Sequence, residues 1–122
     1  MTSYPMLLAL LAHFISDFSL QSDFLAKYKG KSSYVMFVHC FIWAGCVSLA
    51  LEACGLFSIP KFIFLLGGHW LCDHIKCVLV EDWDNALART LLAPRRHMLN
   101  CKLALCVDQA WHMLQLMIVV WA

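Results

Sequence analysis

Four long apolar stretches alternate with polar connections along the chain, and each is close to the length of a membrane-crossing helix. A helix needs about 20 residues to cross the hydrocarbon layer of a bilayer. The stretches run from about Tyr4 to Phe24, Tyr34 to Leu56, Lys61 to Val80 and Cys101 to Ala122. The pattern predicts an all-α fold, an integral membrane four-helix bundle in which residues 1–122 form a single transmembrane domain.

The three connections differ in length and character. Residues 26–33 are basic, and residues 57–60 form a tight turn that contains a proline. Residues 81–100 are long and amphiphilic, and within them Ala86–Leu92 is predicted to form a short interfacial helix. In an alternative arrangement the first stretch is re-entrant and only three helices span, because polar side chains interrupt that stretch.

Composition supports a membrane location. Hydrophobic residues make up 62% of the chain and charged residues 14%, against roughly 45–50% and 25% in soluble domains. A soluble domain of this size keeps much of its surface exposed to water and could not bury so much apolar surface. The net charge of +1 gives no reason to expect nucleic acid as a partner. The expected partners are membrane lipid and a further copy of the chain or a larger membrane complex.

The distribution of lysine and arginine predicts an orientation, because basic residues concentrate in cytoplasmic loops. Only Lys61 belongs to the second connection. The other eight basic residues lie in or beside the first and third connections: Lys27, Lys29, Lys31, Lys76, Arg89, Arg95, Arg96 and Lys102. This places both termini on the non-cytoplasmic side and predicts a multi-pass protein of the bacterial inner (cytoplasmic) membrane.

Histidines and aspartates inside the four stretches share one depth. At 1.5 Å per residue, all of them lie roughly 7–17 Å from the cytoplasmic helix ends under this topology. They come from all four stretches and are His13, Asp17, His39, His69, Asp73, Asp108 and His112. A random scatter of polar residues would not align in this way, so we predict that these side chains form one site.

Six of these residues form pairs four positions apart, so that each pair occupies one helix face. The order is histidine then aspartate in the first and third stretches, and aspartate then histidine in the fourth. Every aspartate therefore lies on the cytoplasmic side of its histidine. The sequence predicts a layer of carboxylates beneath a layer of imidazoles, with His39 nearby.

This residue set is suited to a transition metal. Ionisable groups at such depth cost on the order of 2.5–3.5 kcal/mol each unless they pair, line a water-filled cavity or bind a cation. Imidazole nitrogen and carboxylate oxygen are ligands for zinc, manganese or iron, and four-helix cores hold such metals on inward-facing side chains. A divalent transition metal, with zinc as the first choice, is the predicted cofactor. A single histidine–aspartate pair would by itself be read as a packing contact.

Several other residues receive structural interpretations. Trp43 is interpreted as a packing or lipid-facing residue. The seven cysteines are interpreted as small buried apolar residues, because none of them forms a C-x-x-C pair. The Gly67-Gly68 pair is expected to allow close helix contact beside His69. His74 follows Asp73 and points about 100° away from it, so it is a secondary candidate.

The motifs resemble the DUF3307 family of bacterial and phage integral membrane proteins. The matching segments are His13 to Gln21, Lys29 to Ser32 with His39 after it, an H-x-x-x-D-x-x-K segment from His69 to Lys76, and a D-Q-x-x-H segment from Asp108 to His112. The resemblance spans nearly the whole chain. It implies no established activity. A more distant similarity, at the level of architecture, is to membrane-bound metal-dependent hydrolases.

These features predict a metal-dependent hydrolase that acts on a lipid or lipid-linked phosphate or ester near the cytoplasmic face. The seven histidines and aspartates would be the metal ligands, and one aspartate, Asp17 or Asp73, would serve as general base. His39 would be a further ligand or an acid for the leaving group. Positive charge for a phosphate or lipid headgroup would come from Lys76 and from the basic residues Lys29, Lys31, Arg95 and Arg96.

Two other functions use the same residues. A cavity of this kind could carry a metal ion or protons across the membrane, although four helices would then need an oligomer. The chain could instead be a phage or bacterial interaction protein whose histidine–aspartate cluster holds the helices in register.

Overall fold

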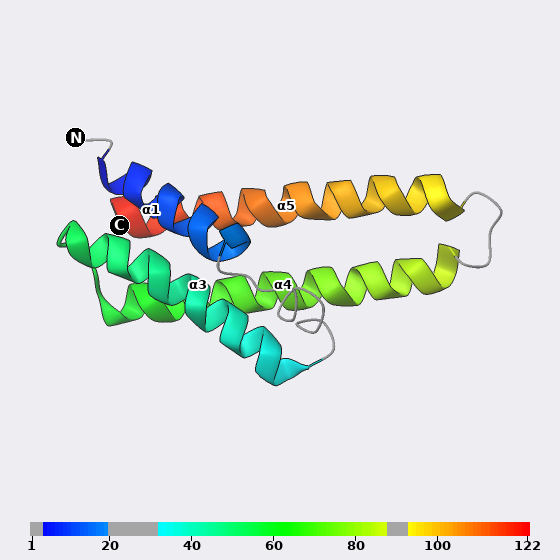
Figure 1. The fold of residues 1–122 in the computed structure, drawn as a ribbon, viewed down its shortest axis with the longest axis horizontal. Coiled ribbons are helices and arrows are strands. Elements are labelled where there is room, and N and C mark those ends of the chain that lie inside the picture. Colours follow the sequence, from blue (N-terminus) through cyan, green and yellow to red (C-terminus); the bar gives the residue numbers. More distant parts are fainter. Residues whose placement is uncertain (1–3, 20–31, 88–92) are drawn as a thin grey trace.

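Every element in the described part of the chain is a helix (Figure 1). The computed structural model describes residues 4–19, 32–87 and 93–122, with side chains for residues 4–17, 32–77 and 103–122. The elements are α1 (Tyr4–Phe14), the π-helical turn η1 (Ile15–Ser19), α3 (Ser33–Ala53), α4 (Ile59–Leu87) and α5 (Ala93–Trp121). The all-α prediction is confirmed for these residues.

The helices pack as an antiparallel bundle. The start of α1, the end of α5 and the turn between α3 and α4 lie at one end of the bundle, and α4 and α5 continue together beyond α1 and α3 at the other end (Figure 1). Contacts join α4 to both α3 and α5, and α1 to both α3 and α5. The four helices therefore enclose a shared interior along the half of the molecule that contains the termini.

The π-helical turn at the end of α1 has a local cause. The Ser16 hydroxyl is buried and donates to the carbonyls of Ala12 at 2.7 Å and His13 at 3.2 Å. Serine side chains that bond back in this way compete with the i→i−4 ladder and bend helices. The wider turn that follows contains Asp17, and single π turns of this kind are frequent at functional sites.

The other helix ends follow ordinary capping rules. Ser32 caps α3, because its side chain accepts from the Val35 amide, as a serine at this position does. At the far end Gly55 adopts a φ of 67°, and the Leu56 amide donates to the Leu51 carbonyl at 2.8 Å. A left-handed glycine with this bonding pattern closes a helix, so the chain reverses directly into α4.

Each helix carries an inward stripe that changes from apolar to polar along the bundle. In α1 the buried residues proceed from Ala9 to His13, with Asp17 one turn further, and in α4 from Leu65 to His69 and Asp73. The same order runs in reverse along α5, through Leu116, His112 and Asp108, and along α3 through Val47, Trp43 and His39. Four-residue spacing keeps each set on one face. The apolar core therefore lies toward the termini, and the polar residues lie next to it.

Helices α4 and α5 approach closely at Gly68. A Cβ atom at this position would collide with the Gln115 amide, whose nitrogen donates to the Phe64 carbonyl at 3.1 Å. The Trp111 indole donates to the Gly68 carbonyl at 3.0 Å. At Gly67 the same atom would meet nothing, so Gly68 alone provides the close contact predicted for the pair.

We expect Gly68→Ala to destabilise the protein by about 1–3 kcal/mol, the usual cost of forcing extra volume into a packed contact. Gly67→Ala is the matched control and should be neutral or slightly stabilising, because alanine is favoured over glycine in a helix by about 0.5–1 kcal/mol. Denaturant unfolding in detergent micelles measures both. Equal effects of the two substitutions would contradict the close contact.

The helix bounds differ from the sequence prediction in the third connection. Helix α4 continues to Leu87 rather than ending near Val80, and α5 begins at Ala93 rather than near Cys101. Pro94 is accommodated in the first turn of α5, where its missing N–H costs no intrahelical bond. The first residues of the predicted interfacial helix belong to α4, and residues 88–92 lie outside the described part.

In the described residues, two helices are long and apolar enough to cross a membrane: α3 and the Leu103–Trp121 segment of α5. Helix α1 and the turn after it, from Tyr4 to Asp17, form a shorter apolar segment. Helix α4 is not one of these two helices, because polar residues lie within its apolar sequence.

Candidate functional site

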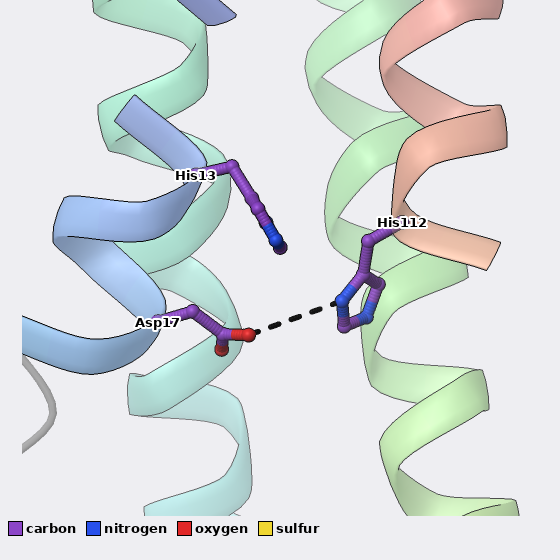
Figure 2. Close-up of side chains that lie close together, drawn as sticks. All are labelled: His13, Asp17 and His112. Carbon is purple, nitrogen blue, oxygen red and sulfur yellow. Dashed lines mark ion pairs between the residues drawn. The ribbon is translucent and has the colours of Figure 1, made fainter. Parts of the chain in front are cut away.

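The seven histidines and aspartates singled out from the sequence lie in one connected network inside the bundle. The contacts run between helices, with His13 and Asp17 from α1 and η1 facing His112 from α5 (Figure 2). Six of the seven side chains are at most 3% exposed and Asp17 is 9% exposed. Buried ionisable groups need partners, and the distances show which partners each has.

Three of these residues bring ligand atoms into a compact triangle. His39 Nε2 lies 3.1 Å from His69 Nε2 and 3.2 Å from Asp73 Oδ2, and His69 Nε2 lies 3.7 Å from the same oxygen. Two ring nitrogens this close share a proton or direct both lone pairs at a cation. Helices α3 and α4 supply the triangle, so it depends on the packing of this helix pair.

Asp17 connects the triangle to α5. Its Oδ1 lies 3.7 Å from His39 Nε2, and its Oδ2 lies 4.0 Å from His112 Nδ1 (Figure 2). The same Oδ2 accepts a hydrogen bond of 3.2 Å from the Gln109 amide. One carboxylate therefore faces two histidines on two different helices.

A chain of hydrogen bonds fixes the tautomer of His13. The Trp43 indole donates to His13 Nδ1 at 2.8 Å, and an indole N–H can only donate. Nδ1 must therefore accept, and the proton of the neutral ring lies on Nε2, which donates to Gln109 Oε1 at 2.9 Å. Gln109 in turn donates to Asp17. The chain from Trp43 through His13 and Gln109 orients the Asp17 carboxylate.

Trp43 also organises the other rings. Its indole stacks on His69 with a centroid distance of 4.2 Å and an interplanar angle of 11°. His69 packs against His112 at 4.2 Å, and Trp43 lies 5.3 Å from His112. Trp43 is fully buried. It therefore separates the apolar core from the polar network and holds three histidine rings in place.

We expect Trp43→Phe to cost about 1–3 kcal/mol, because it leaves a buried imidazole nitrogen without its donor. The His13 ring should then no longer be held in the Nε2–H form, which nitrogen-15 NMR of labelled histidine detects. Trp70→Phe is the control, since Trp70 is an exposed tryptophan of α4. An unchanged His13 tautomer in Trp43→Phe would contradict the assigned chain.

Lys76 neutralises part of the acidic charge. Its Nζ lies 3.0 Å from Asp73 Oδ1 and 2.9 Å from Asp108 Oδ2. The Cys72 thiol donates to Asp108 Oδ1 at 3.3 Å, and His112 Nε2 lies 3.5 Å from the same oxygen. Lys76 is 21% exposed. The lysine predicted to neutralise substrate phosphate is thus engaged with two carboxylates of the network.

Four sets of side chains have ligand atoms within 4.8 Å of one another and could hold a metal ion. They are His13/Asp17/His112, Asp17/His39/His69, Cys40/His69/Asp73 and Cys72/Asp108/His112. The His13 set is a poorer candidate for metal binding, because both ring nitrogens of His13 already make hydrogen bonds, to Trp43 and Gln109. Each of the two sets that contain His39 or His69 shares two residues with the triangle.

A cavity gives access to the network between α4 and α5. Its volume is about 160 Å³. Apolar side chains form most of its wall, and Cys72, Lys76 and Asp108 lie at its polar side. The cavity therefore connects the acidic part of the network to the outer surface of the helix pair.

The remaining predicted site residues are not brought into the network by anything the structure describes. Lys29 and Lys31 lie outside the described residues. Arg95 and Arg96 lie in the first turn of α5, and their side chains are not described. His74, the secondary candidate, is exposed.

Three residues of the network carried no functional prediction. Trp43 and Cys72 were assigned to packing, and Gln109 was noted only as part of a motif. Position could have identified all three. Trp43 lies four residues after His39 on the same face of α3, Cys72 lies four residues before Lys76 on α4, and Gln109 directly follows Asp108. A polar or amphipathic side chain next to a predicted ligand is a candidate for orienting it.

Comparison with known proteins supports the resemblance seen in the sequence. No curated protein and no solved structure matches the chain. A family model described as a protein of unknown function, DUF3307, matches residues 6–122. That match includes every residue of the network described above, and the chain belongs to the DUF3307 family.

Proposed function

We propose that the four helices form an integral membrane bundle. The support is an arrangement in which polar groups are inside and apolar groups are outside. Among the residues whose side chains are described, nine polar or charged residues are buried. Large hydrophobic residues are exposed on all four helices, among them Leu7, Phe41, Leu49, Ile63, Leu71, Val107 and Ile118. Extended apolar surface on a folded protein marks contact with a membrane or partner. Lipid on every side of the bundle accounts for this surface.

In the proposed orientation both termini face away from the cytoplasm, and the paired ends of α4 and α5 face it. Basic residues concentrate at that end, as they do on the cytoplasmic side of bacterial inner-membrane proteins. Each of these helices has 29 residues and is about 43 Å long. This exceeds the roughly 30 Å of the hydrocarbon layer, so both would extend into the headgroup region.

The function that the geometry supports best is metal-dependent hydrolysis of a lipid or lipid-linked phosphate or ester. The observation that carries it is the triangle of His39 Nε2, His69 Nε2 and Asp73 Oδ2, with edges of 3.1, 3.2 and 3.7 Å. Ligands about 2.0–2.1 Å from a tetrahedral zinc ion lie about 3.3 Å from one another. The three atoms are therefore spaced as zinc ligands.

The charge of the network favours a divalent cation. With Asp17, Asp73 and Asp108 ionised, Lys76 protonated and the histidines neutral, the net charge of the network would be −2. An uncompensated charge of this size is costly in a buried site. One divalent cation would neutralise it, and such an ion activates water for hydrolysis at neutral pH.

In this proposal the residues of the network have separate roles in binding, catalysis and positioning. His39, His69 and Asp73 would hold the ion. Asp17 would serve as general base, because its Oδ1 lies 3.7 Å from His39 Nε2 and its other oxygen accepts a hydrogen bond from Gln109. His13 is a positioning residue that acts through Gln109. Proton transfer by a group oriented in this way contributes roughly 10²–10⁴-fold to a rate.

The cavity between α4 and α5 suggests how a lipid would reach the site. Its apolar wall is compatible with an acyl or prenyl chain, and its polar side at Lys76 and Asp108 is compatible with a headgroup. A lipid could therefore enter from the side, from within the bilayer, without leaving the membrane.

The test is hydrolysis by purified protein reconstituted in liposomes that contain lipid phosphates and lipid esters. Release of phosphate or fatty acid should require zinc, stop on chelation, and fall at least about 100-fold in Asp17→Asn, since general-base catalysis contributes roughly 10²–10⁴-fold. His74→Ala is the matched control and should retain full activity. Zinc-loaded protein that hydrolyses neither substrate class would overturn the proposed reaction.

A further inference from the structure

Cys72, Asp108 and His112 form a second cluster of ligand atoms on the other side of the network. Cys72 Sγ and His112 Nε2 lie 3.3 and 3.5 Å from the same carboxylate oxygen, Asp108 Oδ1. All three ligand atoms lie within 4.8 Å of one another. Around a tetrahedral zinc ion a sulfur and an oxygen lie about 3.5 Å apart, and a nitrogen and an oxygen about 3.3 Å. The two distances that meet at Asp108 Oδ1 therefore match those between zinc ligands.

His112 provides an independent indication of a ligand. Its side chain is 0% exposed, and within the described part of the chain neither ring nitrogen makes a hydrogen bond. A buried polar group left in this state costs about 1–3 kcal/mol, and such groups call for an explanation, often an ion or water. Its Nε2 lies 3.5 Å from Asp108 Oδ1, and a cation among Cys72, Asp108 and His112 would give this nitrogen a partner.

We propose that Cys72, Asp108 and His112 bind a second divalent transition metal. Thiolate together with imidazole and carboxylate favours zinc over magnesium or calcium. The Cys72 thiol now donates its proton to Asp108 Oδ1. On binding, that proton is released to water, and the sulfur lone pair is directed at the ion. Cys72 lines the cavity between α4 and α5 together with Lys76 and Asp108.

The second site deepens the proposed function and rests on it for the first ion. Asp17 lies between the two sites, with Oδ1 toward His39 and Oδ2 toward His112. The first divalent ion changes the net charge of the network from −2 to 0. A second divalent ion with the Cys72 thiolate adds +2 and −1, which leaves +1. Metal ions about 3.5–4 Å apart clamp both the attacking and the leaving oxygen of a phosphoryl group, so two ions at that separation would favour a phosphate substrate over a carboxylic ester.

Cobalt(II) reports on the second site separately from the first. Purified protein titrated with cobalt should bind two ions per chain and develop sulfur-to-cobalt charge-transfer absorption in the near ultraviolet. Cys72→Ser should lose the absorption and bind a single ion. Cys106→Ser is the matched control, an exposed cysteine of α5, and should keep both. Cys40→Ser identifies the sulfur, because Cys40 could also reach His69 and Asp73.

The outcomes separate the two proposals. Absorption that survives Cys72→Ser, or that Cys40→Ser abolishes instead, overturns the second site and leaves the first intact. Absorption that depends on Cys72 in protein whose cobalt binding is unaffected by His39→Ala supports the second site and overturns the first. X-ray absorption on zinc-loaded wild-type protein needs no substitution. A zinc–sulfur distance near ~2.3 Å is expected, and zinc with only nitrogen and oxygen neighbours would contradict the proposal.

Discussion

The His39→Ala variant is expected to bind zinc at least about 100-fold more weakly than the wild-type protein at the triangle. His39 Nε2 is the ligand atom that lies closest to the other two, at 3.1 Å from His69 Nε2 and 3.2 Å from Asp73 Oδ2. Losing a group that only orients a ligand already costs about 10–100-fold in affinity, and His39 would be a ligand itself. Competition against a chelating dye in detergent measures the change.

The control for this prediction is His74→Ala, which removes an exposed histidine next to Asp73. It should leave zinc affinity unchanged. His13→Ala should have an intermediate effect, because His13 reaches the site only through Gln109 and Asp17. If His13→Ala and His39→Ala weakened zinc binding equally, the assignment of His13 to a positioning role would be wrong.

The Lys76→Met variant is expected to lose about 3 kcal/mol of stability in the metal-free protein. The substitution keeps the volume of the side chain but leaves Asp73 and Asp108 without their shared cation, which lies 3.0 and 2.9 Å away. Removing one partner of a buried ion pair costs about 3–5 kcal/mol, and the 21% exposure of Lys76 places it at the lower end. Denaturant unfolding gives the free energy.

Zinc should reverse part of this loss. Without Lys76 the network charge changes from −2 to −3, so the variant should gain more stability from zinc than the wild type does. The double variant Lys76→Met/Asp108→Asn should recover stability, because it removes one of the unpaired charges. Lys61→Met is the control, since Lys61 donates to the Leu56 carbonyl at 3.1 Å and lies outside the network. A variant as stable as wild type, with no response to zinc, would contradict the role given to Lys76.

The helices and the inward position of the polar residues could be predicted because both follow from periodicity. Pairs such as His69 and Asp73 lie four residues apart, and this spacing puts them on one face whatever the neighbouring helix does. Family membership was predicted from the same motifs and is confirmed. The bounds of α4 and α5 were less predictable, because residues near 81–100 are polar enough to suggest a connection and also compatible with exposed helix.

The partners within the network could not be predicted, because they depend on how the helices are rotated against one another. Sequence spacing relates His13 to Asp17, but it does not show that Trp43 of α3 donates to His13. Sequence spacing also made His39 a secondary member of the predicted site, because no aspartate lies four residues from it on α3. The structure brings it between Asp17 and Asp73 from two other elements. The π-helical turn that carries Asp17 likewise results from a local bond of Ser16.

In the proposed function, a divalent metal binds among the buried residues His39, His69 and Asp73. An anomalous-difference map from crystals of the wild-type protein, collected on either side of the zinc absorption edge, would locate it. We predict a peak between His39 Nε2, His69 Nε2 and Asp73 Oδ2, at about 2.0–2.2 Å from each. A fully ordered network in zinc-supplemented crystals, with no anomalous peak among these three side chains, would contradict it.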